Sequence, residues 1–199
     1  MTGFRSGGSR AERAEVQRRL ATARRGAELL DRKQRILQRS IEGLDEKAAA
    51  ARQAWEERAR TAALWLRRAD ALDGADRLVG AAPSGTALAT VRWGGAMGIS
   101  YPEEAACRVP SEPPAGGSSA LAFAAAAHRA ALEAAVSAAT SERALLLVSE
   151  ELAATRTRQR AVENRWVPQL EEQLTAIERR IAEQELEESL RLRWAAGLM

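Results

Sequence analysis

The chain has 199 residues, of which 46% are hydrophobic, 4% aromatic and 29% charged. Much of the hydrophobic content is alanine, which favours helices but buries little area, so thin helix-on-helix seams are expected rather than a thick core. The formal net charge of +3 is mild, and the single cysteine, Cys107, excludes an internal disulfide framework. A reducing, cytoplasmic setting is therefore expected.

Membrane-spanning and targeting segments are not apparent in the sequence. No apolar run reaches the roughly 18 residues that a transmembrane helix needs. The N-terminus lacks the apolar core and cleavage pattern of a signal peptide. We therefore expect no direct insertion into a membrane.

The first long helix is predicted over residues 11–73, after a Gly-, Ser- and Arg-rich segment, residues 1–10, that we expect to be flexible. Apolar residues recur here at heptad spacing, which is typical of a coiled coil. A helix of ~60 residues rising 1.5 Å per residue is ~90 Å long, which exceeds any small globular domain. The two sets of positions are Val16, Ala23, Leu30, Leu37, Leu44 and Ala51, and Leu20, Ala27, Gln34, Ile41, Ala48 and Trp55, among which only Gln34 is polar.

Residues 74–118 form a predicted small middle region, because most glycines and prolines of the chain lie there. Ala87–Trp93 and Met97–Tyr101 resemble two short strands of a hairpin. The Pro- and Gly-rich stretch from Pro110 to Gly117 is predicted to be a flexible link. Ser118 or Ser119 can cap the helix that follows.

A second long helix is predicted over residues 119–194, followed by a short tail, residues 195–199. Its apolar stripe changes face after Ile181, which predicts a stutter in the seam. Pro168 lies inside this helix, where a proline removes a hydrogen bond and costs about 3 kcal/mol, so we expect a kink. The stripe consists of Val162, Trp166, Leu170, Leu174, Ile177 and Ile181, and then of Leu186, Leu190 and Trp194.

Two long helical arms joined by a small middle region fold back most economically onto each other. The predicted fold class is all-α: a long antiparallel two-helix coiled coil with a small middle region containing a short β-hairpin and loops. Residues 1–40 carry an excess of Arg and Lys, whereas residues 171–188 are rich in Glu, so antiparallel folding pairs opposite charges. Because a rod encloses no pocket, transmitting force or holding partners is favoured over chemistry.

No catalytic, cofactor-binding or metal site is predicted. The segment Gly80–Thr86 resembles a phosphate-binding loop but lacks its lysine. His128 is the only histidine, which excludes a two-histidine metal site. Cys107 has no histidine or lysine close to it in the sequence that would activate a thiol. The glutamates of residues 171–188 have the spacing of a solvated helix face.

Three stretches carry a more specific signal. The first is Arg24–Lys33, the second Met97-Gly98-Ile99 followed by Pro102, and the third Thr155–Glu163 followed by Val167-Pro168-Gln169-Leu170. In this order and rough spacing they resemble the D subunits of the V-type and A-type rotary ATPases, over about residues 16–194. Asp31 stands where the family usually has lysine, and Gln159 and Arg160 replace a Val-Asn pair.

The resemblance implies the central rotor shaft of such a complex, which couples rotation driven by transmembrane ion flow to ATP synthesis or hydrolysis. The nucleotide sites lie on other chains, so no cofactor is expected. The implied partners are the catalytic A and B subunits around the paired termini, the F subunit on the side of the shaft, and a membrane-side socket subunit at the middle region. The complex is implied to be peripheral to the plasma membrane, on its cytoplasmic side.

The family motif marks a set of residues as expected partner contacts. These are Gly26, Leu29, Leu30, Lys33, Met97, Gly98, Pro102, Thr155, Arg158, Arg160, Pro168 and Leu170. A shaft that turns inside a ring favours sparse, polar and basic contacts, which further arginines on both arms could also supply, namely Arg18, Arg19, Arg24, Arg25 and Arg165.

Two other functions fit the residues. One is a coiled-coil scaffold or tether without rotary partners, although a simple tether does not need the Met97–Pro102 turn between its arms. The other is a basic coiled coil that binds nucleic acid, which salt-dependent DNA binding would indicate. The absence of aromatic residues among the arginines favours no nucleic-acid partner.

Overall fold

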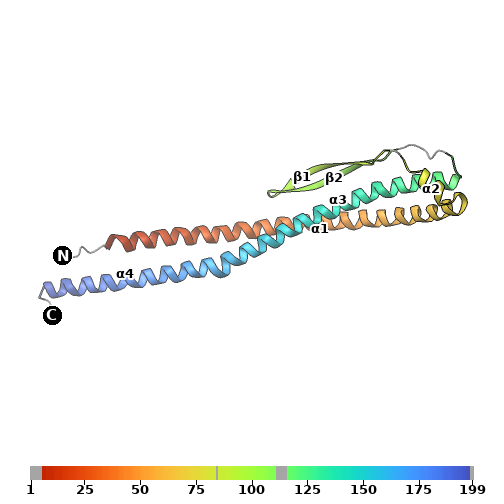
Figure 1. Ribbon diagram of the computed structural model, residues 1–199. Coiled ribbons are helices and arrows are strands. Elements are labelled where there is room, and N and C mark those ends of the chain that lie inside the picture. Colours follow the sequence, from red (N-terminus) through yellow and green to blue (C-terminus); the bar gives the residue numbers. More distant parts are fainter. Residues whose placement is uncertain (1–5, 84, 111–115, 198–199) are drawn as a thin grey trace. The chain divides into compact units, whose positions relative to one another are not determined.

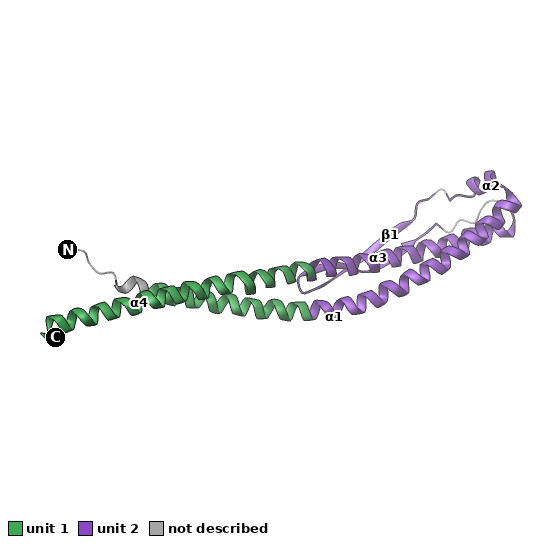
Figure 2. Ribbon diagram, turned by 90° about the horizontal axis from the view of Figure 1, so that it is seen from below, with its two compact units in different colours: residues 1–35, 153–199 green, residues 36–152 purple. Residues whose placement is uncertain are grey.

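The computed structural model describes residues 6–83, 85–110 and 116–197. Figure 1 shows the elements in chain order. They are α1 (Ser6–Asp73), α2 (Ala75–Gly80), β1 (Leu88–Ala96), β2 (Ile99–Arg108), α3 (Ser119–Ala161), the π-helix η1 (Val162–Trp166) and α4 (Val167–Ala195). The chain divides into two compact units: unit 1 consists of residues 1–35 and 153–199, and unit 2 of residues 36–152 (Figure 2).

Four predicted segments fall partly outside the described residues. They are the flexible start at residues 1–10, the Gly80–Thr86 loop, the link from Pro110 to Gly117 and the tail at residues 195–199. Within the described part of the first segment, α1 already begins at Ser6.

In unit 1, α1 and α4 are held together by a narrow apolar seam. Val16 and Leu20 of α1 form a buried cluster with Leu170 and Ile177 of α4. Half-buried apolar side chains, among them Leu174, pack against this cluster. Because each buried aliphatic side chain contributes about 1.5–3 kcal/mol, the seam supplies most of the stabilisation in this unit.

Exposed ion pairs flank the seam of unit 1 and reveal the direction of its helices. As the residue number of the α1 partner rises from one pair to the next, that of the α4 partner falls. The two helices therefore run antiparallel. The basic arm therefore lies beside the glutamate-rich arm, as the charge distribution predicted. The pairs are Arg10–Glu185 at 3.0 Å, Glu12–Arg180, Arg13–Glu178 at 3.2 Å and Arg24–Glu171 at 2.7 Å.

The π-helix η1 shifts the seam of the returning helix by one residue. Thr155, Gln159 and Val162 point into the seam, and an uninterrupted α-helix would next place residue 166 there. Val167 takes that place instead, because a π-helical turn holds one extra residue. Trp166 is consequently 60% exposed.

Two predictions for this arm are therefore wrong. Trp166 does not belong to the apolar stripe, and the change of phase occurs at η1 rather than after Ile181. Beyond Ile181, Leu186 and Trp194 are exposed. Pro168 lies in the first turn of α4 just after η1, a position in which a missing N–H is tolerated.

In unit 2, α1 packs antiparallel to α3. Near one end of the unit, Leu37 and Val148 are fully buried together with Leu152. Near the other end, Ala69 packs against the start of α3 at Ala120 and its neighbours. Small alanine side chains allow the two backbones to approach closely but bury little area.

The same unit contains an ion pair between its two long helices. Arg52 Nη2 lies 2.6 Å from Glu142 Oε1, and the hydrogen bond to this carboxylate raises the pKa of Arg52. The pair joins α1 to α3 between the two buried clusters.

The hairpin of unit 2 is longer than predicted. Met97 and Gly98 form its two-residue turn with φ angles of 52° and 83°, so Met97 is not part of a strand. Positive φ at both central residues is the conformation that joins twisted antiparallel strands most tightly. The second strand, predicted to end at Tyr101, continues to Arg108.

A bulge explains how a strand continues through a proline. Arg92 pairs with Glu104, whereas the next residue, Trp93, pairs with Pro102, so Glu103 is the extra residue. A bulge is one of the few places in a sheet that tolerate the missing N–H of proline. Ile99 and Tyr101 pack against the cluster around Leu37 and Val148, which ties the hairpin to the helices.

The predicted fold class is confirmed. Long antiparallel helices pair through a narrow seam, and a small two-stranded hairpin lies in the middle of the chain. Eleven of the twelve heptad positions of α1 are buried or half-buried, the exception being Trp55, which is 39% exposed.

Candidate partner-binding surfaces

The residues that the family motif marks divide between the two units. Met97, Gly98 and Pro102 belong to the hairpin turn and bulge of unit 2. The other nine lie in unit 1, at Gly26, Leu29, Leu30, Lys33, Thr155, Arg158, Arg160, Pro168 and Leu170.

The motif residues differ in what they can do. Thr155 is 0% exposed and Leu170 is part of the buried cluster, so both hold the helices together. Leu29 is 57% exposed, and Arg158 and Arg160 are exposed as well. These three side chains are accessible to a partner.

An open groove of about 640 Å³ runs along unit 1. Ala23, Gly26 and Leu30 of α1 and Val162 of η1 contribute its apolar surface, and Trp166 also lines it. A Cβ atom added to Gly26 would meet nothing within 4 Å, so the glycine leaves the groove open. We call this hollow the Trp166 groove.

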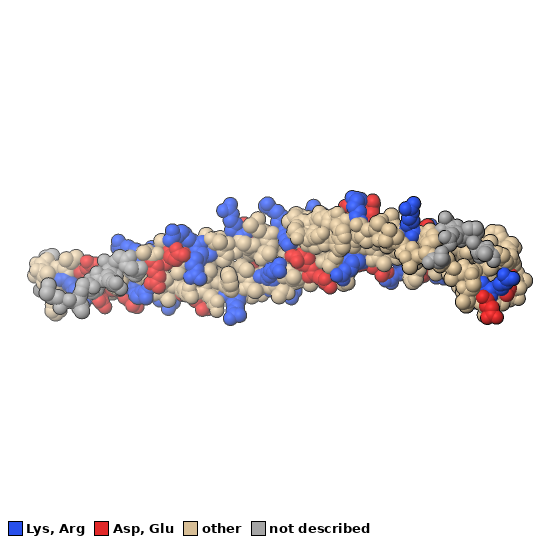
Figure 3. All heavy atoms as spheres, turned by 45° about the horizontal axis from the view of Figure 1, so that its top comes forward, with Lys and Arg blue, Asp and Glu red and all other residues tan. Residues whose placement is uncertain are grey.

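The part of unit 1 that contains this groove is strongly basic. Residues 18–35 and 153–166, here called the basic belt, carry eleven Arg and Lys residues against three Asp and Glu residues. Residues 171–188 instead carry seven glutamates and two arginines. Figure 3 shows Lys and Arg side chains along the face in view, interspersed with Asp and Glu side chains and with stretches of uncharged surface.

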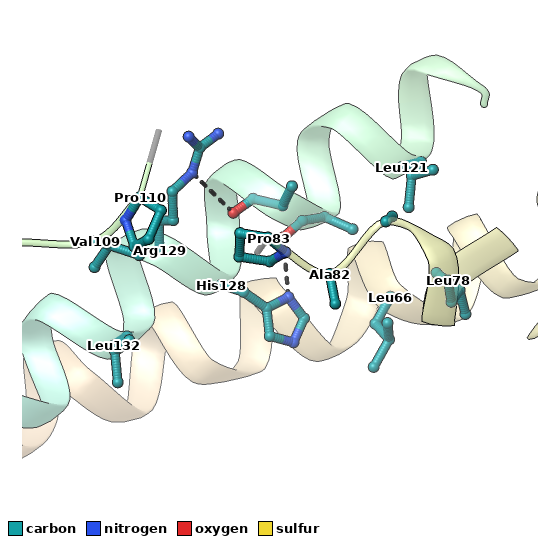
Figure 4. Close-up of a pocket in the computed structure, with 13 residues that line it drawn as sticks. Leu66, Leu78, Ala82, Pro83, Val109, Pro110, Leu121, His128, Arg129 and Leu132 are labelled. Atoms are coloured by element: carbon teal, nitrogen blue, oxygen red, sulfur yellow. Dashed lines mark hydrogen bonds between the residues drawn. The ribbon is translucent and has the colours of Figure 1, made fainter. Parts of the chain in front are cut away.

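Unit 2 contains an apolar pocket of about 350 Å³ near the junction of its helices (Figure 4). Leu66 of α1, Leu78 of α2 and Leu121 of α3 line it together with Pro83 and Pro110. Because these side chains come from three helices and two flanking segments, the pocket depends on how the middle region folds over α1 and α3.

Two polar residues border this pocket, and both are bound to their own helix. His128 Nδ1 lies 2.9 Å from the carbonyl oxygen of Ala124, and Arg129 Nε donates to the carbonyl oxygen of Ala125 at 3.3 Å. Figure 4 shows these two interactions on α3. His128 thus makes a local hydrogen bond.

Aromatic and aliphatic side chains are exposed around the same end of unit 2. Phe123 stacks on Trp65 with 4.7 Å between the ring centroids, and the guanidinium carbon of Arg68 lies 4.7 Å from the centroid of the Trp65 ring. Other large apolar side chains in this part of unit 2 are exposed as well, namely Leu64, Leu66, Leu72, Val79, Phe123 and Leu132.

Among the described residues, no three His, Cys, Asp or Glu side chains gather in a way that could hold a metal ion. In the hairpin, Arg92 binds Glu103 at 2.8 Å and Glu104 at 3.1 Å, and the hydrogen bond to Glu104 in particular raises the pKa of Arg92. These ion pairs link β1 to β2 at the bulge.

The comparison with protein families identifies the chain. The model of the ATP synthase D-subunit family matches residues 12–197, which include both arms and the middle region. The chain belongs to this family. A search of curated proteins found no match.

Family membership makes this chain an ATPase subunit, and its structure reveals a surface that sequence reasoning missed. The Trp166 groove was overlooked because the spacing of Val162, Trp166 and Leu170 indicates one continuous stripe. The sequence did contain a signal: Val167, Leu170 and Leu174 are one residue out of phase with Thr155, Gln159 and Val162.

No described helix is both long enough and apolar enough to cross a membrane.

Proposed function

We propose that this chain is the central-stalk rotor of a V/A-type rotary ATPase. It couples rotation driven by transmembrane ion flow to ATP synthesis or hydrolysis in a catalytic head made of A and B subunits. The single observation that carries this proposal is the match to the ATP synthase D-subunit family over residues 12–197. The nucleotide sites belong to other chains, and this chain works without a cofactor.

The physical properties of each unit support a mechanical role. Two helices that share an apolar seam resist bending and twisting better than one, which a torque-bearing element needs. Unit 1 adds ion pairs on the outside of its seam, such as Arg24–Glu171. Unit 2 adds the Arg52–Glu142 pair between its two clusters.

The partners follow from the same proposal. The helix ends of unit 1 enter the A–B head, the F subunit binds the side of the shaft, and a membrane-side socket subunit receives the middle region. The apolar pocket and exposed aromatic residues of unit 2 suit this last contact, because an exposed apolar patch is stabilised by a partner. The complex sits on the cytoplasmic side of the plasma membrane.

The motif residues take partner contacts in this proposal according to their exposure. Leu29, Arg158 and Arg160 reach the head directly. Thr155 and Leu170 act by holding the two helices of unit 1 together. Basic contacts suit a shaft that must turn, since exposed charge pairs are individually weak and exchange easily with water.

A rotation measurement distinguishes a rotor from a tether. In a Cys107→Ser background, a bead is attached to a cysteine placed at the exposed position Glu133, and the A–B head is immobilised. We expect unidirectional rotation of the bead on addition of ATP, and none with ADP. A chain that binds the head while its bead stays still under ATP would be a tether, and the rotor proposal would be wrong.

A further inference from the structure

Two seam positions of the returning helix in unit 1 are separated by eight residue steps, from Val162 to Leu170. Val162 is half-buried, and Leu170 belongs to the buried cluster. Because an α-helix turns about 100° per residue, eight steps carry the chain about 80° past two full turns. In η1 the N–H of Val167 donates to the carbonyl of Val162, and this π-helical turn holds the extra residue that takes up the excess.

Either of two residues can occupy the seam between these two positions. The structure uses Val167, which comes five residues after the first position and three before the second. Trp166 is 60% exposed as a result. A spacing of four and four would place Trp166 on the seam instead, and four is a spacing that an α-helix provides. Because both routes share their first and last residues, changing from one to the other rotates only residues 163–169.

A hollow for the indole is already present. The Trp166 groove, of about 640 Å³, is lined on the returning helix by Val162 and Leu170, the two residues that both routes share. On α1 its apolar surface includes Gly26, where an added Cβ would meet nothing within 4 Å. Its described polar lining lies within residues 15–22. The part of the groove over Gly26 therefore offers an apolar surface of the kind that an indole buries.

Pro168 opposes the burial of Trp166. In the structure this proline lies in the first turn of α4, where its missing N–H is tolerated. An uninterrupted α-helix would place it in the helix interior, where its ring clashes with the carbonyl of Asn164. Burying the indole gives a stabilisation of the same order as the cost of that clash. The two windings are therefore close in free energy, with the π-helical one favoured.

We propose that η1 is a two-state switch in the winding of the returning helix. In the state of the structure, Val167 packs in the seam and Trp166 lies outside it. In the second state the segment is α-helical, the indole lies in the Trp166 groove over Gly26, and Val167 turns outward. Pro168 sets the ratio of the two states. The inference concerns unit 1 alone and does not depend on the proposed rotor function.

Removing the proline tests the switch. Pro168→Ala, made in the full chain, should raise the ratio of the α-helical to the π-helical state by about a hundredfold. The fluorescence of Trp166 reports where its indole lies, and it is obtained by subtracting the spectrum of the same protein carrying Trp166→Phe. In Pro168→Ala we expect this emission to move to shorter wavelength and to be quenched less by acrylamide. Unchanged quenching would overturn the proposal.

A second variant tests where the indole goes. Gly26→Leu fills the groove, so in the Pro168→Ala background it should return the Trp166 emission to that of the wild type. The matched control is Gly43→Leu in the same background, because Gly43 also lies in α1, also has nothing within 4 Å of an added Cβ, and does not line the groove. This control should keep the shift. A shift that survives Gly26→Leu would show that the groove does not receive the indole, and the proposal would be wrong.

Val167 provides a reciprocal readout that does not use fluorescence. In a Cys107→Ser background, a thiol is introduced by Val167→Cys at this half-buried position. Labelling of a covered group follows the population of the state that exposes it. The introduced thiol should therefore react several-fold faster with a thiol reagent when Pro168→Ala is added. Equal rates with and without Pro168→Ala would contradict the switch, and circular dichroism checks that all variants keep the helix content of the wild type.

Discussion

Asp73, the last residue of α1, is bonded to Ser118, the residue before α3. The carboxylate of Asp73 accepts a hydrogen bond from the backbone N–H of Ser118 at 2.8 Å and another from its hydroxyl at 2.5 Å. The Ser118 hydroxyl oxygen also accepts from the N–H of Leu121 at 3.4 Å, so Ser118 rather than Ser119 is the N-cap among the two candidates that the sequence offered. One carboxylate thus joins the two long helices of unit 2.

We expect Asp73→Ala to lower the free energy of unfolding by about 1–2 kcal/mol, because two donors of Ser118 lose their partner. Asp73→Asn should lose less, since it keeps an acceptor oxygen. Asp70→Ala is a suitable control, because Asp70 is exposed on the same helix turn. Urea unfolding measures all three, and equal midpoints for Asp73→Ala and Asp70→Ala would contradict the expectation.

A polar layer interrupts the seam of unit 1, where Gln34 Nε2 donates to the side-chain oxygen of Gln159. The side-chain nitrogen of Gln159 in turn donates to Glu163 Oε1 at 2.7 Å. Gln34→Leu should lower the free energy of unfolding by about 1 kcal/mol, because Gln159 loses its donor in a half-buried seam. The double variant with leucine at both positions should be at least as stable as the wild type but less specific in register.

Register can be measured separately from stability. Spin labels at the exposed positions 25 and 172 of unit 1 report the distance between its helices. We expect one narrow distance distribution for the wild type and a broader one for the double leucine variant. An equally narrow distribution would show that the apolar seam alone aligns the helices.

Pro168 and η1 should depend on each other energetically. Deleting Asn164 removes the extra residue of the π-helix, so the seam would continue as a regular α-helix with Pro168 in its interior. This deletion should cost about 3 kcal/mol, and adding Pro168→Ala should recover most of the loss. Thermal or urea unfolding of the two single variants and the combination gives the coupling, and strictly additive effects would refute it.

The exposed ion pairs of unit 1 should contribute modestly and in a salt-dependent way. Arg24→Glu places a second carboxylate beside Glu171, and should lower the free energy of unfolding by about 0.5–1 kcal/mol at low salt. The swapped double variant, Arg24→Glu with Glu171→Arg, should restore most of it. The difference should shrink at high ionic strength because solvent-exposed charges are screened.

The pairing of the long helices follows from the amino-acid sequence alone. Val16, Leu20 and Leu37 recur at heptad spacing. Because an exposed apolar stripe is unfavourable in water, the burial of these side chains could be predicted without knowing which helix packs against them. The charge difference between the arms likewise predicted which segments lie together. The positive φ angles at Met97 and Gly98 match a turn that the family motif had marked.

The phase of the second arm, by contrast, was settled by the tertiary fold. Whether Trp166 or Val167 faces α1 depends on the single extra residue in the π-helical turn η1. The extent of β2 through Pro102 was settled in the same way, by a bulge at Glu103. Hydrophobic periodicity reports only the local preference of a segment. The π-helical turn at η1 and the bulge at Glu103 are changes in the backbone hydrogen-bond pattern, and they depend on how each segment packs against its neighbours.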